Sequence, residues 1–123
     1  MEYQVTAKYL RMGPRKVRLI ADAIRGMKAT DAVVVLKSTP KHAAKPVIAA
    51  ILSAIANAKS QQAAIENLKI MSIDVMGGPA LKRWHAASKG MAHPFKRRMS
   101  HLKVVLTDGV QKETKVVAVK GGK

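Results

Sequence analysis

Residues 77–100 read GGPALKRWHAASKGMAHPFKRRMS, and this stretch decides the shape of the molecule. It holds glycine, proline, small residues and cations, but no periodic apolar pattern that could form a core. Its strongest turn signal is Ser88-Lys89-Gly90. A hairpin about that turn has arms of about 12 residues, roughly 40 Å at the rise of a strand. A body of this size has a radius of gyration of only about 12 Å, so we expect the hairpin, at about residues 77–101, to project.

The segments on either side of this stretch alternate between apolar and polar residues, as half-buried strands do. Before it, Leu68–Met76 places Met71, Ile73 and Val75 on one face. After it, Leu102, Val104 and Leu106 alternate with His101, Lys103 and Val105. The N-terminus repeats the pattern, with inward positions at Tyr3, Val5, Ala7 and Tyr9. These three segments predict a three-stranded antiparallel sheet, which needs a cover on one face.

Three helical patterns can supply that cover. The first, Pro14–Arg25, ends before Gly26 and has an apolar stripe at Val17, Ile20, Ala21 and Ile24. The second runs from a Thr30 cap to about Ser38, although its valines also suit a strand. The third opens at Thr39-Pro40 and ends near Lys59–Gln62, with its stripe at Ala44, Ile48, Ile51, Leu52 and Ile55. Within it, Pro46 either kinks the helix or marks where the regular part begins.

The fold class that follows is α+β: three helices packed on a small three-stranded antiparallel sheet, with a long protruding β-hairpin. Residues 1–108 form a single domain in this interpretation. Residues 109–123 form a basic tail that ends in Gly-Gly-Lys, and we expect it to be flexible.

Charge indicates the partner. The chain has 123 residues, with 23 Lys+Arg against 7 Asp+Glu, for a formal net charge of +16. Such an excess on a small body favours a polyanionic partner, and nucleic acid is the default. Two stretches contain no acid, Tyr3–Ala21 and Val75–Thr107. Their cations are Lys8, Arg11, Arg15, Lys16 and Arg18 in the first, and Lys82, Arg83, Lys89, Lys96, Arg97, Arg98 and Lys103 in the second.

Other classes of function have little support in the sequence. Cysteine is absent, so no thiolate can serve as nucleophile or ligand. The acids are scattered, and no phosphate-binding glycine loop or nucleophile–base pair is present, so we expect no enzyme. His85, His93 and His101 recur every eight residues, but a strand separates the last two by roughly 26 Å. We therefore expect no metal and no cofactor. No apolar run is long enough to span a bilayer, and we expect no membrane insertion.

Several motifs together resemble the bacterial-type L-twenty-two family of large-subunit ribosomal proteins. The resemblance runs from about Glu2 to Asp108. Its motifs are Arg15–Asp22 with Ile24-Arg25-Gly26, Ser53–Ala58, Gly78–Arg83, Ala87–Gly90 and Lys96–His101. The chain departs from the family pattern at Met91, Trp84-His85 and Pro94.

The resemblance implies a cytoplasmic protein of the large subunit, with an organellar ribosome left open. Its partners would be ribosomal RNA, neighbouring large-subunit proteins and the nascent polypeptide. The family's body lies outside the RNA, while its hairpin runs through the RNA and lines the peptide exit tunnel with its tip. The tip residues here are Ala87, Ser88, Lys89, Gly90 and Met91. Charge and resemblance together give as RNA-binding candidates Lys8, Arg11, Arg15, Lys16, Arg18, Lys82, Arg83, Trp84, Lys89, Lys96, Arg97, Arg98, Ser100, His101 and Lys103.

Three alternatives remain at this stage. The first is a stand-alone basic nucleic-acid-binding protein. A membrane-active cationic protein is less favoured, because much of the charge lies outside the helices. An enzyme ranks last.

Overall fold

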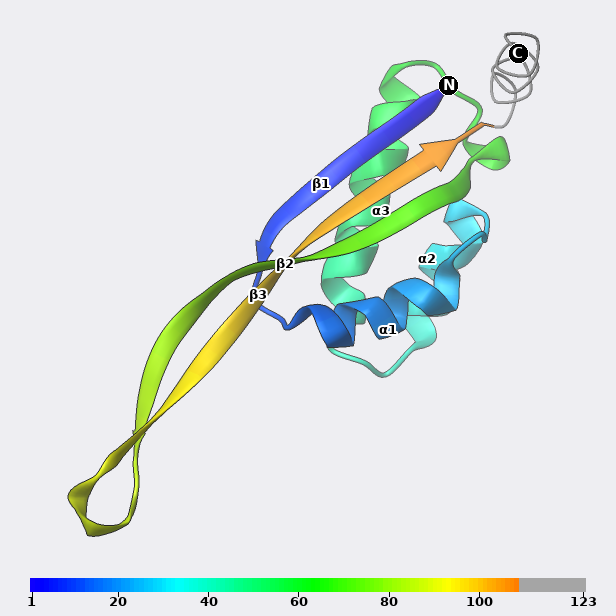
Figure 1. Ribbon diagram of the computed structural model, residues 1–123. Helices are drawn as coiled ribbons and strands as arrows, with labels where there is room; N and C mark the ends of the chain where they lie inside the picture. The colour runs from blue at the N-terminus through cyan, green and yellow to red at the C-terminus, as the bar shows by residue number, and fades with distance from the viewer. Residues whose placement is uncertain (109–123) are drawn as a thin grey trace, which may run out of the picture.

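The computed structural model describes residues 1–108 (Figure 1). The predicted tail, residues 109–123, lies outside the described residues. Along the chain, the elements are β1 (Glu2–Leu10), α1 (Pro14–Ile24), α2 (Ala29–Ser38), α3 (Ala44–Ser60), a 3-10 turn (Ile65–Asn67), β2 (Lys69–Ala86), a second 3-10 turn (Ser88–Gly90) and β3 (Ala92–Thr107).

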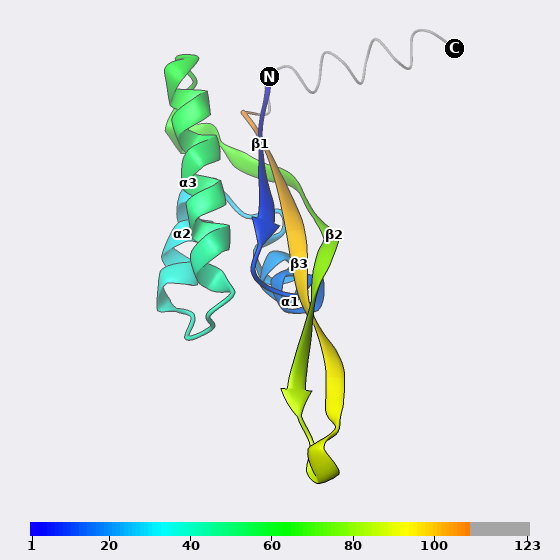
Figure 2. The same ribbon diagram turned by 90° about the vertical axis from the view of Figure 1, so that its left-hand side faces the viewer.

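The strands form one antiparallel sheet in the order β1-β3-β2, so β3 is central. Within the body, β3 pairs with β1 from Glu2↔Thr107 to Leu10↔Ser100. On its other side, it pairs with β2 from Lys69↔Thr107 to the hairpin tip. α3 lies against β1 and β3, α1 lies against β2, and α2 packs on α3 (Figures 1 and 2). The predicted α+β class, with its helices, sheet and long hairpin, is confirmed.

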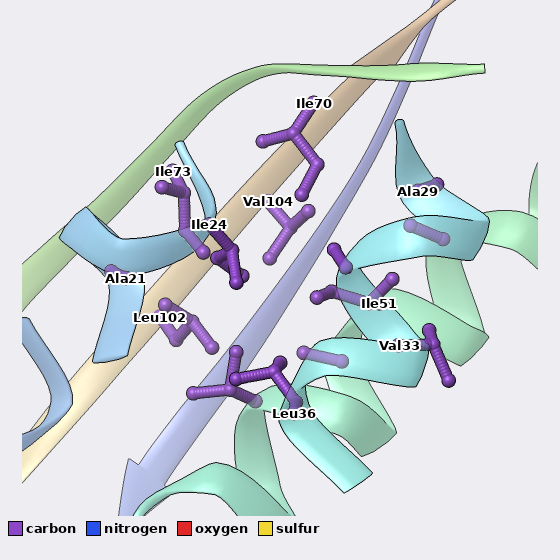
Figure 3. Close-up of a cluster of buried hydrophobic side chains, with 14 of the residues drawn as sticks. Ala21, Ile24, Ala29, Val33, Leu36, Ile51, Ile70, Ile73, Leu102 and Val104 are labelled. Atoms are coloured by element: carbon purple, nitrogen blue, oxygen red, sulfur yellow. The ribbon is translucent and has the colours of Figure 1, made fainter. Parts of the chain in front are cut away.

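The core lies between the sheet and the helices (Figure 3). α1 contributes Val17, Ile20, Ala21 and Ile24, which is the predicted stripe. Leu36 of α2, Ile51 of α3 and Ile73 of β2 meet Leu102 and Val104 of the central strand, all at most 2% exposed. Burial of such side chains is the main force that holds the helices on the sheet.

Two β-bulges overturn parts of the predicted alternation. Tyr9 is 59% exposed and has φ +59°, at a register shift between Ala7 and Leu10. The extra residue turns Tyr9 out of the inward face. A second shift, between Ile70 and Ser72, leaves Met71 40% exposed. One inserted residue reverses the side that each following residue faces, because side chains alternate with a period of two.

The second and third helices also differ from expectation. α2 begins at Ala29, with Lys28 at the N-cap, so Thr30 is not the cap. α3 begins at Ala44, which puts Pro46 in its first turn rather than at a kink. Its buried face consists of Ala44, Val47, Ala50, Ile51, Ala54 and Ala58, while Ile48 and Ile55 are half-buried.

Leu52, which was predicted to be buried, is 47% exposed. At 100° per residue it lies about 200° from Ala50, on the far side of the helix. The small alanines let α3 approach its neighbours closely, and the larger residue faces outward.

The stretch 77–100, called the arm below, projects from the body as predicted (Figure 2). β2 and β3 pair out to Ala86↔Ala92, and the chain reverses at Ser88–Gly90. The Met91 N–H donates to the Ser88 carbonyl at 3.3 Å, and Lys89 and Gly90 have φ of +62° and +70°. Two central residues with positive φ are typical of the type I′ turn that joins tight hairpins.

The arm leaves the body at a third bulge, between Gly77 and Ala80. A Cβ on Gly78 would lie 3.2 Å from the Met99 carbonyl carbon and oxygen and 3.3 Å from His101 Cε1. A Cβ on the neighbouring Gly77 would meet nothing within 4 Å. At Gly78 the two strands therefore approach so closely that the backbone of β3 must move slightly to admit a Cβ.

We expect Gly78→Ala to lower the free energy of unfolding by about 1–2 kcal/mol, because backbone atoms of β3 must shift. Gly77→Ala is the matched control and should be neutral or slightly stabilising, since both changes restrict the unfolded chain equally. Urea denaturation of the two variants measures the difference. Equal stabilities would contradict the close approach.

Candidate nucleic-acid interface

The arm has no acid to balance its cations. Among the described residues, none from Val75 to Thr107 is Asp or Glu. Lys82 and Lys96 lie directly opposite each other in the register, and both are exposed. Like charges that face each other across a strand pair destabilise it. An anion bound between the two ammonium groups would relieve this repulsion.

The two faces of the arm both carry charge. Leu81 pairs with Arg97, and Ala80 pairs with Arg98. Successive residues of a strand point to opposite faces, so the two arginines project in opposite directions. An anionic partner can then contact the arm on both sides.

A groove lies where the arm meets the body, with a volume of about 710 Å³. Its lining comes from three parts of the chain: the β1–α1 connection with the first turn of α1, the segment just before α3, and the proximal arm. The lining residues are Arg11, Met12, Gly13, Lys16, His42, Ala43, Leu81, Arg83, Lys96, Arg97, Arg98 and Met99.

Six of these lining residues are Lys or Arg, and none is acidic. A concave surface lined by one sign of charge concentrates the electrostatic field and attracts counter-ions. Arg11 and Lys16 thus join the arm cations, although more than 60 residues separate them in the sequence. The groove also holds apolar atoms of Met12, Leu81 and Met99.

Other predicted cations lie apart from this groove. Lys8 is exposed on β1, and Arg15 is exposed in the first turn of α1. Arg18 donates from its guanidinium to the Val75 carbonyl at 3.2 Å, which ties α1 to β2. Lys103 is half-buried and lies opposite Asp74 in the register. Arg18 therefore has a contact within the fold as well as charge, and Lys103 has an acidic residue opposite it on the neighbouring strand.

Two predicted site residues are built into the base of the arm. Ser100 is 0% exposed, and its Oγ has no hydrogen-bond partner among the described residues. His101 is half-buried, and its Nδ1 accepts the Tyr9 N–H at 3.1 Å. The two rings meet edge to face, with centroids 5.0 Å apart. Neither residue offers a freely exposed side chain for RNA.

The tip is exposed and carries one cation. Ser88, Lys89, Gly90 and Met91 are exposed, while Ala87 is half-buried. Trp84 is 66% exposed and lies opposite Pro94, so it does not anchor the arm in the core.

Comparison with known proteins decides the family. The sequence model of the family described as Ribosomal protein L22p/L17e matches residues 5–107. The chain belongs to this family. The matched range runs from β1 to the end of β3, so it includes the body, the groove and the whole arm.

Individual members of the L22p/L17e family agree with that assignment. The chain is 38% identical over 109 residues to the large ribosomal subunit protein uL22 of Syntrophobacter fumaroxidans, which covers 88% of this chain and 99% of that protein. It is 41% identical over 109 residues to uL22 of Syntrophus aciditrophicus, with the same coverage. Against uL22 of Pediococcus pentosaceus it is 41% identical over 106 residues, or 85% of this chain and 90% of that one. The resemblance seen in the motifs is confirmed.

The histidines of this L22p/L17e chain are dispersed. His85 and His93 face each other across the arm, with ring centroids 6.1 Å apart. His101 lies at the base with Tyr9. Within residues 1–108, no three His, Asp or Glu side chains gather so that they could hold a metal ion. None of the helices in the same range combines the length and hydropathy that crossing a bilayer requires.

Sequence reasoning missed the apolar lining of the groove and one lining residue with a polar side chain. His42 lies between α2 and α3 and lines the hollow beside Ala43. It belongs to neither acid-free stretch that was singled out, and no periodic pattern includes it. The packing of α3 on the sheet brings it there.

Proposed function

We propose that this chain is a structural component of the large ribosomal subunit in the cytoplasm and binds ribosomal RNA through the arm and the groove at its base. Membership of the L22p/L17e family supports the ribosomal assignment. The observation that carries RNA binding is the groove itself, with its six Lys and Arg residues and no acid. The role needs no catalytic step, cofactor or metal.

Phosphate neutralisation is the proposed mechanism. Each Lys or Arg that contacts a phosphate releases condensed counterions, which contributes affinity without reading the base sequence. The groove is concave and the arm is charged on both faces, so RNA segments can converge on the arm from several directions. The body then remains outside the RNA, while the arm holds those segments together.

The proposal extends to the tip. Ala87–Met91 line the exit tunnel for the nascent polypeptide in this assignment, and neighbouring large-subunit proteins contact the body. The exposure of the tip and its single cation, Lys89, support a surface that does more than neutralise phosphate. The lone cation limits adhesion of a passing chain with acidic residues.

The test removes charge from the groove while keeping the length of the side chains. We expect the triple variant Lys96→Gln, Arg97→Gln and Arg98→Gln to bind large-subunit ribosomal RNA about 10- to 100-fold more weakly near physiological salt. The slope of log affinity against log salt should fall by about 2–3, because three phosphate contacts are lost. Filter binding at several salt concentrations measures both.

The matched control is Lys28→Gln, Lys59→Gln and Lys69→Gln, which removes the same charge from residues that do not line the groove. Its salt slope should change by less than about 1. Equal losses in the two triples would show that net charge, and not the groove, drives binding. Sedimentation of the wild-type protein with chromosomal DNA instead of large subunits would favour the stand-alone alternative.

A further inference from the structure

The arm consists of two chemically different halves. The proximal arm, residues 80–83 and 96–99, contains Lys82, Arg83, Lys96, Arg97 and Arg98. The distal arm, residues 84–95, contains Lys89 as its one Lys or Arg, and no acid. The distal arm instead contains the chain's single Trp, its single Phe and two of its four His. Phosphate neutralisation explains the proximal arm but not the distal one.

The register sorts these rings onto the two faces of the ribbon. Trp84 lies opposite Pro94 on one face, between the Lys82↔Lys96 and Ala86↔Ala92 pairs. The other face carries Arg83↔Phe95 and His85↔His93. The next pair on this face toward the tip is Ala86↔Ala92. Both side chains are single methyl groups, so no large side chain stands beside the indole there.

The second face forms a continuous row of planar groups. The His85 and Phe95 ring centroids are 5.4 Å apart, and those of His85 and His93 are 6.1 Å apart. The Arg97 guanidinium lies 5.4 Å from the Phe95 ring centroid and joins the row to the proximal arm. Phe95 is half-buried and both histidines are exposed, so one side of the row is open to solvent.

The packing of the body does not explain why aromatic rings are exposed on a ribbon that has no core of its own. Trp84 is 66% exposed, in a chain whose aromatic content is only 3%. Exposed aromatic planes beside phosphate-binding cations are how proteins hold unpaired bases, which have π-faces whatever their sequence.

We propose that the distal arm binds unpaired RNA bases by stacking, with Trp84 on one face and the His85–Phe95 row on the other. This inference rests on the proposed RNA-binding function. The distal arm then binds nucleobases, whereas the proximal arm binds phosphates.

The single tryptophan makes a direct test possible. Emission of Trp84 in the full chain is measured during titration with deproteinised large-subunit ribosomal RNA, and separately with fully double-helical RNA. We expect the ribosomal RNA to quench the emission at least about twofold at saturation, because a base stacks on the indole. Duplex RNA offers no unpaired base, and should bind at low salt with little quenching.

Affinities of variants for fluorescently labelled ribosomal RNA complete the test. Trp84→Ala and Phe95→Ala should each weaken binding about tenfold and leave the salt slope unchanged, since stacking releases no counterions. Trp84→Phe should retain most of the affinity. The matched control is Met91→Ala, which removes a side chain 67% exposed on the same distal arm and should change affinity less than about twofold.

The outcomes separate the two levels of the proposal. Salt-dependent binding without quenching, or with Trp84→Ala equal to wild type, overturns stacking and leaves RNA binding in place. If ribosomal RNA leaves Trp84 emission unchanged and the RNA affinity does not depend on salt, the proposed function itself is overturned. A salt slope that falls in Trp84→Ala also counts against stacking, because it assigns the lost contact to phosphate.

Discussion

Replacing Lys82–Lys96 by the dipeptide Asn-Gly is expected to leave the body folded and to weaken binding to large-subunit ribosomal RNA by about 1,000-fold. Leu81 and Arg97 are cross-strand partners, so a two-residue type I′ turn can close the shortened hairpin. The residues removed are exposed, except for Ala87 and Phe95, which are half-buried. None of them belongs to the core. Four cations are lost, which should lower the salt slope by about 3–4.

The measurement pairs thermal unfolding with RNA binding on the same protein. The melting temperature should stay within about 5 °C of wild type, because the core is unchanged. Loss of a cooperative transition would show that the arm stabilises the body, against the architecture described above. Retained tight binding would place the RNA contacts on the body instead.

Leu102→Ala is expected to lower the free energy of unfolding by about 3–4 kcal/mol. Leu102 is 0% exposed on the central strand, and the cavity left by the truncation is enclosed by the helices. For a domain whose total stability is about 5–15 kcal/mol, this is a large fraction. Urea denaturation followed by circular dichroism checks it.

The control is the same truncation in the arm. Leu81 is 39% exposed on β2, so Leu81→Ala should cost less than about 1 kcal/mol. Leu81 lies in the groove, so the RNA affinity of the Leu81→Ala variant can fall although its stability is kept. Similar stability losses for the two leucines would mean that the arm shares the core.

The arm was predictable from the sequence because the signals that specify it lie within the arm itself. Residues 77–100 contain no apolar period, and Ser88-Lys89-Gly90 offers a turn, so a projecting hairpin keeps the cations of this stretch out of a core. Trp84 shows the limit of that reasoning. Its position in the arm was evident, but its face was not, since the bulge at Gly77–Ala80 sets which side each arm residue occupies.

The bulges and the face of α3 could not be predicted, because pairing and packing decide them. Tyr9 takes a positive φ only because β1 must rejoin β3 at Ser100 after one extra residue. Leu52 is more hydrophobic than alanine, yet it is 47% exposed, while Ala50 and Ala54 are buried in the core. Local propensity gives way to tertiary context at such positions.

The candidate site was predictable in composition but not in shape. The cations of the groove were identified one by one, whereas the hollow that joins Arg11, His42 and Arg98 exists only after folding. Ser100 is the reverse case. Its place in the Lys96–His101 motif suggested RNA contact, yet the structure buries it completely at the base of the arm. Sequence motifs do not distinguish a residue that binds from one that positions the residues that bind.

Because β3 is at once the middle strand of the body and one side of the arm, any pull on the tip acts on backbone that is bonded on both flanks. Hydrogen bonds in an antiparallel ladder run across the strands, so a force along β3 loads many of them in shear together instead of opening them one after another. β3 runs as one strand from the arm into the hydrophobic core, so a force applied at the tip is expected to act on the core through that strand.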